Sequence, residues 1–456
     1  MVSLAIACFV LAFLALGMRR PFIWVLAYCY VDIVGPQKIA VSLLDPLQVS
    51  LVAFIAAFGG WLIADNKTDS RFTLRQGLIL ALLIYCGLTT TMADFPVEAA
   101  SKFEWVWKAL VFAIFLPLTL RTRLRIEAVA LVMVLSAASI IISGGMKTAL
   151  GGGGYGTLRL LVNDNTGLYE SSIISCVAVA IIPVILWLAK HGTVFPSDWR
   201  VKIFAAALTF ACLLIPVGTE ARTGLLCIAV LAVLSLRSVK RRFLYIASAT
   251  ALALVAIPFL PDSYTKRMNT IENHAGDQSA STRVAVWQWT LEYVQDHPFG
   301  GGFDAFRGNK LRIETRTAEG TGNNQAVEVT EIQDQARAYH SSYFEMLGEQ
   351  GYLGLLLWLF LMFSGLWQME RLRRRWKART GPDEQWQAPL ANALQQALAI
   401  YMVGALFVGI AYQPFVYMLI GLQCGLWSYL RRVDSPHQPK FQRKPGVVVK
   451  HAVAAR

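Results

Sequence analysis

Residues 171–190 read SSIISCVAVAIIPVILWLAK, a run of twenty residues in which Lys190 is the only charged side chain. Apolar runs of roughly 16 to 25 residues recur along the chain, and this length is typical of helices that cross a membrane. Apolar residues make up 55% of the sequence and charged residues 16%. Because the bilayer core has no water to satisfy backbone groups, and the runs lack the alternation of a β-barrel, the spans are predicted to be helices.

The expected fold is all-α: a polytopic membrane bundle of 12 or 13 transmembrane helices with a long loop that contains helices. The expected spans are 2–17, 20–35, 47–64, 76–94, 104–120, 123–143, 171–190, 201–217, 222–237, 242–261, 342–367, 394–411 and 414–430. The first two are short and are separated by Met18-Arg19-Arg20-Pro21, so twelve spans is the alternative count. The first run has no N-terminal charge and no cleavage site before a soluble domain, which argues against a cleaved signal peptide.

Basic loops predict how the bundle is oriented. Segments rich in Lys and Arg are 19–20, 121–125, 237–242, 371–379 and the tail from Arg431. By the positive-inside rule these face the cytoplasm, and the net charge of +13 is then a signal of topology and not of nucleic-acid binding. The expected parts are N-terminal transmembrane helices (1–261), a periplasmic loop domain (262–341), C-terminal transmembrane helices (342–430) and a cytoplasmic basic tail (431–456).

The long outer loop has a pattern of its own. A helix is expected from Ser281 to about Asp296, and it is too apolar to be fully solvated. His297-Pro298 ends it, and Gly300-Gly301-Gly302 then allows the backbone to approach a partner or ligand closely. Residues 308–335 are polar and are predicted to form a mobile flap.

Several kinds of site are not indicated. The seven cysteines all fall in apolar spans without a CxxC pair, so we expect buried free thiols. The sequence has no HExxH, no His/Cys cluster and no GxxxxGK[ST] motif, so neither a metal site nor a bound cofactor is expected. No inverted repeat of the kind found in many transporters is evident.

His340 is the candidate general base. It lies in YHSSYFEMLGEQGYLG, residues 339–354, where the polar loop gives way to an apolar helix. A neutral imidazole at this outer helix mouth can take a proton from a hydroxyl at physiological pH. The alternative is a structural histidine. Gly351 and Gly354, further along the helix, are expected to permit close helix packing.

Arg222 and Arg283 are candidate phosphate ligands near the same face. A guanidinium at a helix mouth is costly without an anionic partner, and arginine suits bidentate contact with phosphate oxygens. Pairing with a loop carboxylate such as Glu220, or snorkelling to lipid headgroups, is the alternative. Candidate supporting residues on this side are Arg337, Arg159, Lys108, Trp287 and Glu349. Lys102 and Lys147 are further cations there.

The order of these pieces resembles the core of the O-antigen ligase/polymerase superfamily, over roughly residues 200–430. The matching pieces are Thr219–Gly224, Arg283-(x3)-Trp287, His297-Pro298-Phe299-Gly300-Gly301-Gly302 and His340-(x8)-Glu349-Gln350-Gly351-(x2)-Gly354. The N-terminal half is similar to exosortase-associated O-glycosylation ligases. The pieces there are Arg19-Arg20-Pro21, Trp107-Lys108, Gly151-Gly152-Gly153-Gly154-Tyr155 and Asn163-Asp164-Asn165.

The resemblance implies a multi-pass glycosyltransferase of the bacterial inner membrane with a periplasmic active site. Its donor would be a glycan on undecaprenyl diphosphate, and its acceptor a hydroxyl of lipid A-core, a glycan or a protein. His340 would be the base, Arg222 and Arg283 would hold the diphosphate without a metal, and the anomeric carbon would invert. The partners would be these substrates and membrane lipids. The alternatives are an O-antigen or exopolysaccharide polymerase, a polysaccharide flippase or transporter, and a metal-dependent oligosaccharyltransferase using Asp94, Glu98 and Asp164.

Overall fold

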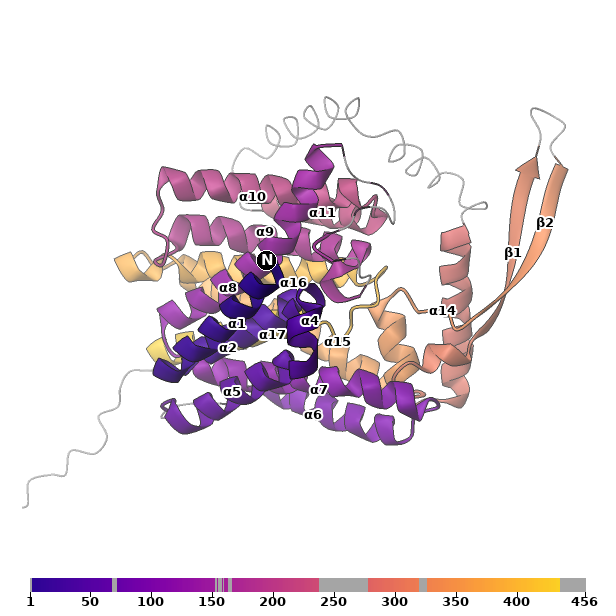
Figure 1. Cartoon of the computed structure of the whole chain (residues 1–456), viewed down its shortest axis with the longest axis horizontal. Helices are drawn as coiled ribbons and strands as arrows, with labels where there is room; N and C mark the ends of the chain where they lie inside the picture. Colours follow the sequence, from indigo (N-terminus) through magenta and orange to yellow (C-terminus); the bar gives the residue numbers. More distant parts are fainter. Residues whose placement is uncertain are drawn as a thin grey trace, which may run out of the picture.

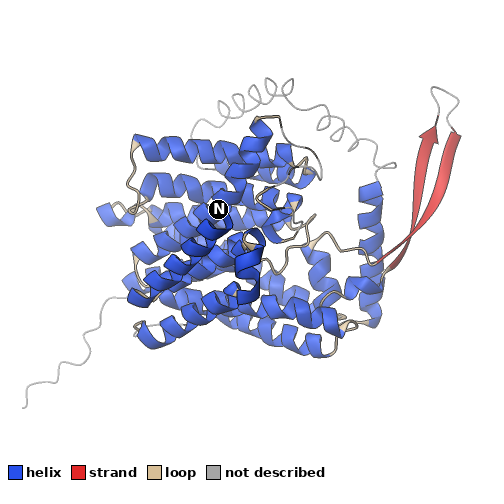
Figure 2. Ribbon diagram, in the orientation of Figure 1, coloured by secondary structure: helices blue, strands red, loops and turns tan. Residues whose placement is uncertain are grey.

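The computed structural model describes residues 2–67, 72–151, 154, 158, 160–162, 166–237, 278–319 and 326–434, and they are mostly helical (Figure 1, Figure 2). The helices before the long loop are α1 (Val2–Arg19), α2 (Phe22–Val34), α3 (Pro36–Ile39), α4 (Val41–Leu44), α5 (Val49–Ala64), α6 (Leu74–Thr91), α7 (Pro96–Thr119), α8 (Arg123–Ala149), α9 (Ser171–His191), α10 (Trp199–Gly218) and α11 (Arg222–Leu236). Those in and after the loop are α14 (Gln278–Asp296), α15 (Ser342–Lys377), α16 (Gln387–Gly404) and α17 (Pro414–Asp434). Short 3-10 turns are η1 (Asp45–Leu47), η2 (Gly167–Tyr169), η5 (Ala305–Gly308) and η6 (Pro382–Glu384).

The helical fold predicted from hydropathy is confirmed. Twelve of the thirteen expected spans coincide with helices, and the expected span 242–261 lies outside the described residues. Within the described part, six helices are long and apolar enough to cross a membrane, or seven if the bent pair Val41–Leu47 and Val49–Ala64 is one span. The lower count arises because α2 and α11 have only 13 and 15 residues, α7 is rich in charge, and α16 and α17 contain glutamines and are less apolar. The chain is a multi-pass membrane protein, and the count of 12 or 13 spans stays a prediction.

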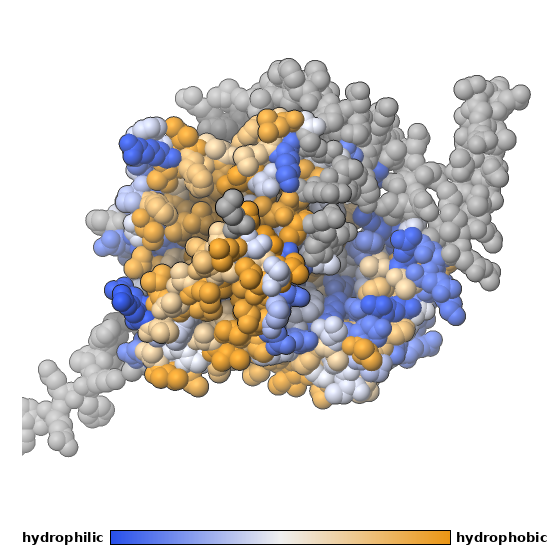
Figure 3. All heavy atoms as spheres, viewed as in Figure 1, coloured by the Kyte–Doolittle hydropathy of each residue, from blue (hydrophilic) through white to orange (hydrophobic). Residues whose placement is uncertain are grey.

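The core of the bundle runs along α9 and α17. Every side chain from Ile173 to Ile185 and from Phe415 to Leu426 is buried. Large apolar side chains also cover the outside, and Leu186 and Phe210 are 54% and 61% exposed. Figure 3 shows apolar residues over most of the helices in view and polar residues toward the ends. Such a surface fits contact with lipid chains. The seven cysteines are free thiols, as expected; six are buried, and Cys8 is exposed.

One end of the bundle gathers the basic loops. The contacts there are Arg125 to Asp65 (2.8 Å), Arg123 to the His191 carbonyl (2.8 Å), Arg432 to the Leu120 carbonyl (3.0 Å) and Arg237 to Glu370 (2.7 Å). Loops far apart in the sequence therefore share one end, as the positive-inside argument requires. That this end faces the cytoplasm stays a prediction.

The long loop crosses the other end. Figure 1 shows α14 standing across the bundle, with the strands β1 (Lys310–Glu319) and β2 (Ala326–Gln335) beyond it. The predicted loop helix is confirmed and begins no later than Gln278. The segment predicted as a flap instead holds an antiparallel hairpin in which Ile313 pairs with Ile332. Its β-branched residues were the available signal, but polar neighbours masked it.

The helix α15 is broken at Gly351, whose φ is 62°. The Gly301 N–H donates to the Gly348 carbonyl and the Gly302 N–H to the Glu349 carbonyl, each at 3.0 Å. These carbonyls lie just before the break, where helical partners are missing. The loop segment therefore replaces the hydrogen bonds that the break removes. We expected Gly351 to serve close helix packing, and it serves this break instead.

Glycine is required where this segment meets the helix. A Cβ on Gly351 would lie 2.2 Å from the Pro298 carbonyl oxygen, and one on Gly300 would lie 2.5 Å from the Glu349 carbonyl oxygen. Both glycines also have positive φ, which other residues rarely adopt. The predicted close approach of this turn is confirmed, and its partner is the broken helix.

We expect Gly351→Ala to lower the Tm of the purified protein, because the new Cβ meets Pro298 and the positive φ costs alanine about 1–3 kcal/mol. Thermal unfolding in detergent measures this. Gly59→Ala is the matched control, since no atom lies within 4 Å of its Cβ position, and its Tm should be unchanged or slightly higher. Equal Tm values for the two variants would contradict the role of Gly351.

Candidate functional site

His340 lies two residues before α15, between two anchored neighbours. Its φ of 47° is in the left-handed region, which is uncommon for residues other than glycine. Tyr339 before it is buried and packs edge-on against Phe306 at 5.7 Å. The Ser342 N–H after it donates to the Ala405 carbonyl at 2.8 Å. His340 itself is partly exposed, so a fixed backbone holds this imidazole at the surface.

Trp287 of α14 holds the segment that carries His340. Its indole N–H donates to the Tyr339 carbonyl at 2.9 Å. Its ring stacks on Phe344 with centroids 4.9 Å apart and planes at 4°. The predicted supporting residue Trp287 is thus brought close to the predicted base, and its contacts hold the segment around His340 in position.

Arg283 and Arg337 act electrostatically on His340. Partial burial lowers the pKa of His340 below its usual value near 6.5, and the charges of both arginines lower it further. A lower pKa favours the neutral imidazole at pH 7, which is the form that a general base requires. Arg283 of α14 and Arg337, which follows the hairpin, therefore both lie near the predicted base His340.

Asn309 fixes the position of Arg337. Its side-chain amide donates to the Arg337 carbonyl at 2.7 Å and accepts the Arg337 N–H at 3.0 Å, and Asn309 is fully buried. The Arg337 guanidinium pairs with Asp334. The sequence did not single out Asn309, because an asparagine before a strand is ordinary turn chemistry.

Arg222 is the first residue of α11 and is partly buried. The Cys227 thiol contacts the Ile400 carbonyl of α16 at 3.8 Å. The helices α11 and α16 are antiparallel. Arg222 is five residues before Cys227 in α11, and Ala405 is five residues after Ile400, just past the end of α16, so both residues lie on the same side of this contact. Because Ala405 binds the start of α15, Arg222 and His340 lie at the same end of the bundle. Arg159, the other N-terminal candidate, is outside the described residues.

Lys102 forms a buried ion cluster that the sequence did not predict. Its ammonium lies 2.8 Å from both Glu345 and Glu349 and 3.7 Å from Asp304. Glu349, a predicted supporting residue, is fully buried and also accepts the Asp304 N–H at 3.0 Å. It therefore ties α15 to α7 and to the loop. The available signal was the spacing of Glu345 and Glu349, which places two carboxylates on one helix face.

A polar cleft of about 870 Å³ opens beside this cluster. Its walls are the ends of α2 and α7, η2, the start of η5 and the segment 409–414. Lys108, predicted as a supporting residue, lines this cleft. Among the described residues that line it, His340, Arg222 and Arg283 do not occur. The predicted residues thus fall into two neighbouring regions, a base with arginines and a cleft.

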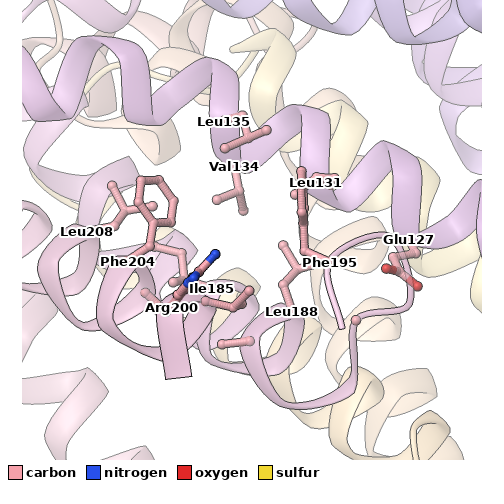
Figure 4. Close-up of a pocket in the computed structure, with 14 residues that line it drawn as sticks. Glu127, Leu131, Val134, Leu135, Ile185, Leu188, Phe195, Arg200, Phe204 and Leu208 are labelled. Atoms are coloured by element: carbon pink, nitrogen blue, oxygen red, sulfur yellow. The ribbon is translucent and has the colours of Figure 1, made fainter. Parts of the chain in front are cut away.

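A second cavity, of about 340 Å³, lies between α8, α9 and α10 and is mostly apolar (Figure 4). Its polar side chains are Glu127 and Arg200, and the Glu127 carboxylate already accepts the Val194 N–H at 2.6 Å. This lining suits hydrocarbon and offers few partners for a sugar or a phosphate.

Two of the three carboxylates considered for a metal site are described, and they have different surroundings. Asp94 accepts the Tyr293 hydroxyl, Glu98 lines the cleft, and Asp164 is outside the described residues. Within the described ranges, no group of three or more His, Cys, Asp or Glu side chains is arranged to hold a metal.

Two families match parts of the chain. Residues 205–359 match the O-antigen ligase family, and residues 1–193 match DUF5935, a family of unknown function. No curated protein matches the chain. The first match contains Arg222, Arg283 and His340. The chain is thus a multi-pass membrane protein that carries an O-antigen ligase domain at residues 205–359, preceded by a DUF5935 region at residues 1–193.

Proposed function

We propose that the protein transfers a glycan from an undecaprenyl diphosphate carrier to an acceptor hydroxyl, at the periplasmic face of a bacterial inner membrane. The observation that carries the proposal is His340, partly exposed and with a lowered pKa beside Arg283 and Arg337 within an O-antigen ligase domain. That family implies a transferase that uses polyprenyl-linked glycans. The acceptor is lipid A-core, another glycan or a protein.

The proposed reaction is one direct displacement. Nε2 or Nδ1 of His340 takes the proton of the acceptor hydroxyl, and that oxygen bonds to the anomeric carbon of the donor sugar. The bond from this carbon to the diphosphate oxygen breaks, and the electron pair leaves with the lipid diphosphate. Attack from the opposite side inverts the anomeric carbon. The proton remains on His340 until it passes to water.

The arginines serve two purposes in this scheme. Their charge keeps the imidazole unprotonated, and the same charge matches the negative charge that develops on the leaving diphosphate. Arg283 lies beside the base, and Arg222 stands at the N-terminus of α11, where the helix dipole also favours an anion. Preorganised cations of this kind need no metal for the displacement.

Replacing the base tests the scheme directly. We expect His340→Ala to reduce kcat by about 10²–10⁴-fold, the usual contribution of a general base, with unchanged donor binding and Tm. The assay uses donor glycolipid extracted from a deletion strain. His297→Ala is the control, because this exposed histidine of the same loop stacks on Tyr293 at 4.2 Å and should leave turnover intact. Wild-type turnover by His340→Ala would refute the base.

The glycans of the same deletion strain show whether the protein is a ligase or a polymerase. Loss of attachment with normal glycan length on the carrier indicates a ligase. Loss of long chains with retained attachment of single units indicates a polymerase.

The diphosphate ligands are tested by donor titration. We expect Arg222→Ala and Arg283→Ala each to raise the donor KM by about tenfold or more, the effect of losing one charged hydrogen bond. Arg200→Ala, an exposed arginine at the opposite end of the bundle, is the control. A donor KM that stays constant in both variants would exclude the proposed diphosphate contacts.

The pH profile tests the coupling between base and arginines. Because cations disfavour the imidazolium, Arg337→Ala should raise the pKa of His340 toward its usual value. Activity needs the neutral form, so the acid limb of kcat/KM should move to higher pH. Arg337→Lys keeps the charge and should leave the limb near its original position. The coupling is wrong if the limb of Arg337→Ala does not move.

A further inference from the structure

The polar cleft joins the two matched regions of the chain. Most of its lining comes from residues 31–38, 97–108 and 166–173, which belong to the DUF5935 region. The opposite wall includes Asp304 and Glu345 of the O-antigen ligase domain. The DUF5935 region therefore builds a large cavity against the domain that carries His340.

Among the residues that the structure describes, the charges lining the cleft balance. Four cations, Lys38, Lys102, Lys108 and Arg307, face four carboxylates, Asp32, Glu98, Asp304 and Glu345. Lys102 binds Glu345 at 2.8 Å, and Arg307 lies 3.3 Å from Asp304. Lys108 interacts electrostatically with Asp32. A diphosphate needs cations in excess, so this lining does not favour one.

The same lining suits an uncharged ligand that is rich in hydroxyl groups. Trp105 lines the cleft and is 39% exposed, so part of this aromatic side chain is accessible. Ser101, Gln37 and Gln413 add neutral donors and acceptors. The ion pairs hold their members in place, which preorganises further hydrogen-bonding groups. A sugar ring has an apolar face for an aromatic ring and hydroxyls for such groups.

The cleft also lies near the proposed reaction centre along the chain. Glu345 lines it and lies about one helical turn after Ser342, the first residue of α15. His340 is two residues before that start. A chain bound in the cleft therefore extends toward the base, while the arginines occupy the side of α14 and the hairpin.

We propose that this cleft binds an oligosaccharide segment of a substrate, and that the DUF5935 region contributes glycan recognition to the site of His340. The proposal rests on the proposed transferase function. The bound ligand is a sugar chain without net charge. This chain is part either of the acceptor or of the donor glycan. Two kinds of cleft variant and two substrates distinguish these sources.

The first measurement is kinetic and uses the full-length protein in detergent. Donor glycolipid and unmodified acceptor are both extracted from the deletion strain. Trp105→Ala removes the aromatic ring, and Ser101→Trp fills the cleft. We expect each variant to raise either the donor KM or the acceptor KM at least tenfold, with kcat within threefold of wild type. A higher acceptor KM assigns the cleft to the acceptor, and a higher donor KM assigns it to the donor glycan. Trp199→Ala is the matched control, being 62% exposed on α10 and outside the cleft.

The second measurement is direct binding, and it stands even if transfer is not observed. Free oligosaccharides released by mild acid from the donor and acceptor fractions are titrated against wild-type and variant protein. We expect wild type and Trp199→Ala to bind one of them, and Trp105→Ala and Ser101→Trp to bind it at least tenfold more weakly. The proposal is overturned if both folded cleft variants bind both sugars like wild type. If His340→Ala keeps its activity, only the assignment of the base is wrong. Failure of the proposed function and failure of the glycan-binding cleft are therefore distinguishable.

Discussion

The ammonium group of Lys102 is the contact on which the arrangement of the site depends. It is held between Glu345 and Glu349 of α15 at 2.8 Å each, and Glu345 also accepts the Ala411 N–H at 3.0 Å. Removing one member of such a cluster leaves buried charge without a partner, which costs about 3–5 kcal/mol. The N-terminal half of the chain and the helix that follows His340 are therefore fixed to one another.

Two electrostatic environments lie side by side at this end of the bundle. Around His340, Arg283 and Arg337 lower the pKa of the imidazole; around Lys102, carboxylates balance the cation. The first suits a negative leaving group and a neutral base, and the second suits an uncharged chain. In the proposed reaction, the leaving diphosphate and the sugar chain therefore bind to different parts of the fold.

The sequence predicted those features that depend on local pattern. Apolar runs predicted twelve helices within the described part, and Arg283 and Trp287, four residues apart, fall on one face of the predicted loop helix. It could not predict contacts that the tertiary fold makes across long separations, such as that of Lys102 with Glu349. The hairpin was missed because its strands are polar, and the break at Gly351 was missed because its hydrogen-bond partners come from a distant loop.

The break at Gly351 also divides α15 mechanically. The segment from Ser342 to Gln350 is bound to the loop through Gly301 and Gly302, whereas the longer remainder can adjust to the bilayer. Membrane helices answer changes in hydrocarbon thickness by tilting. If α15 were one unbroken helix, such a tilt would also displace its N-terminal end, next to His340. We expect the break at Gly351 to absorb such a tilt, so that His340 keeps its alignment in membranes of different thickness.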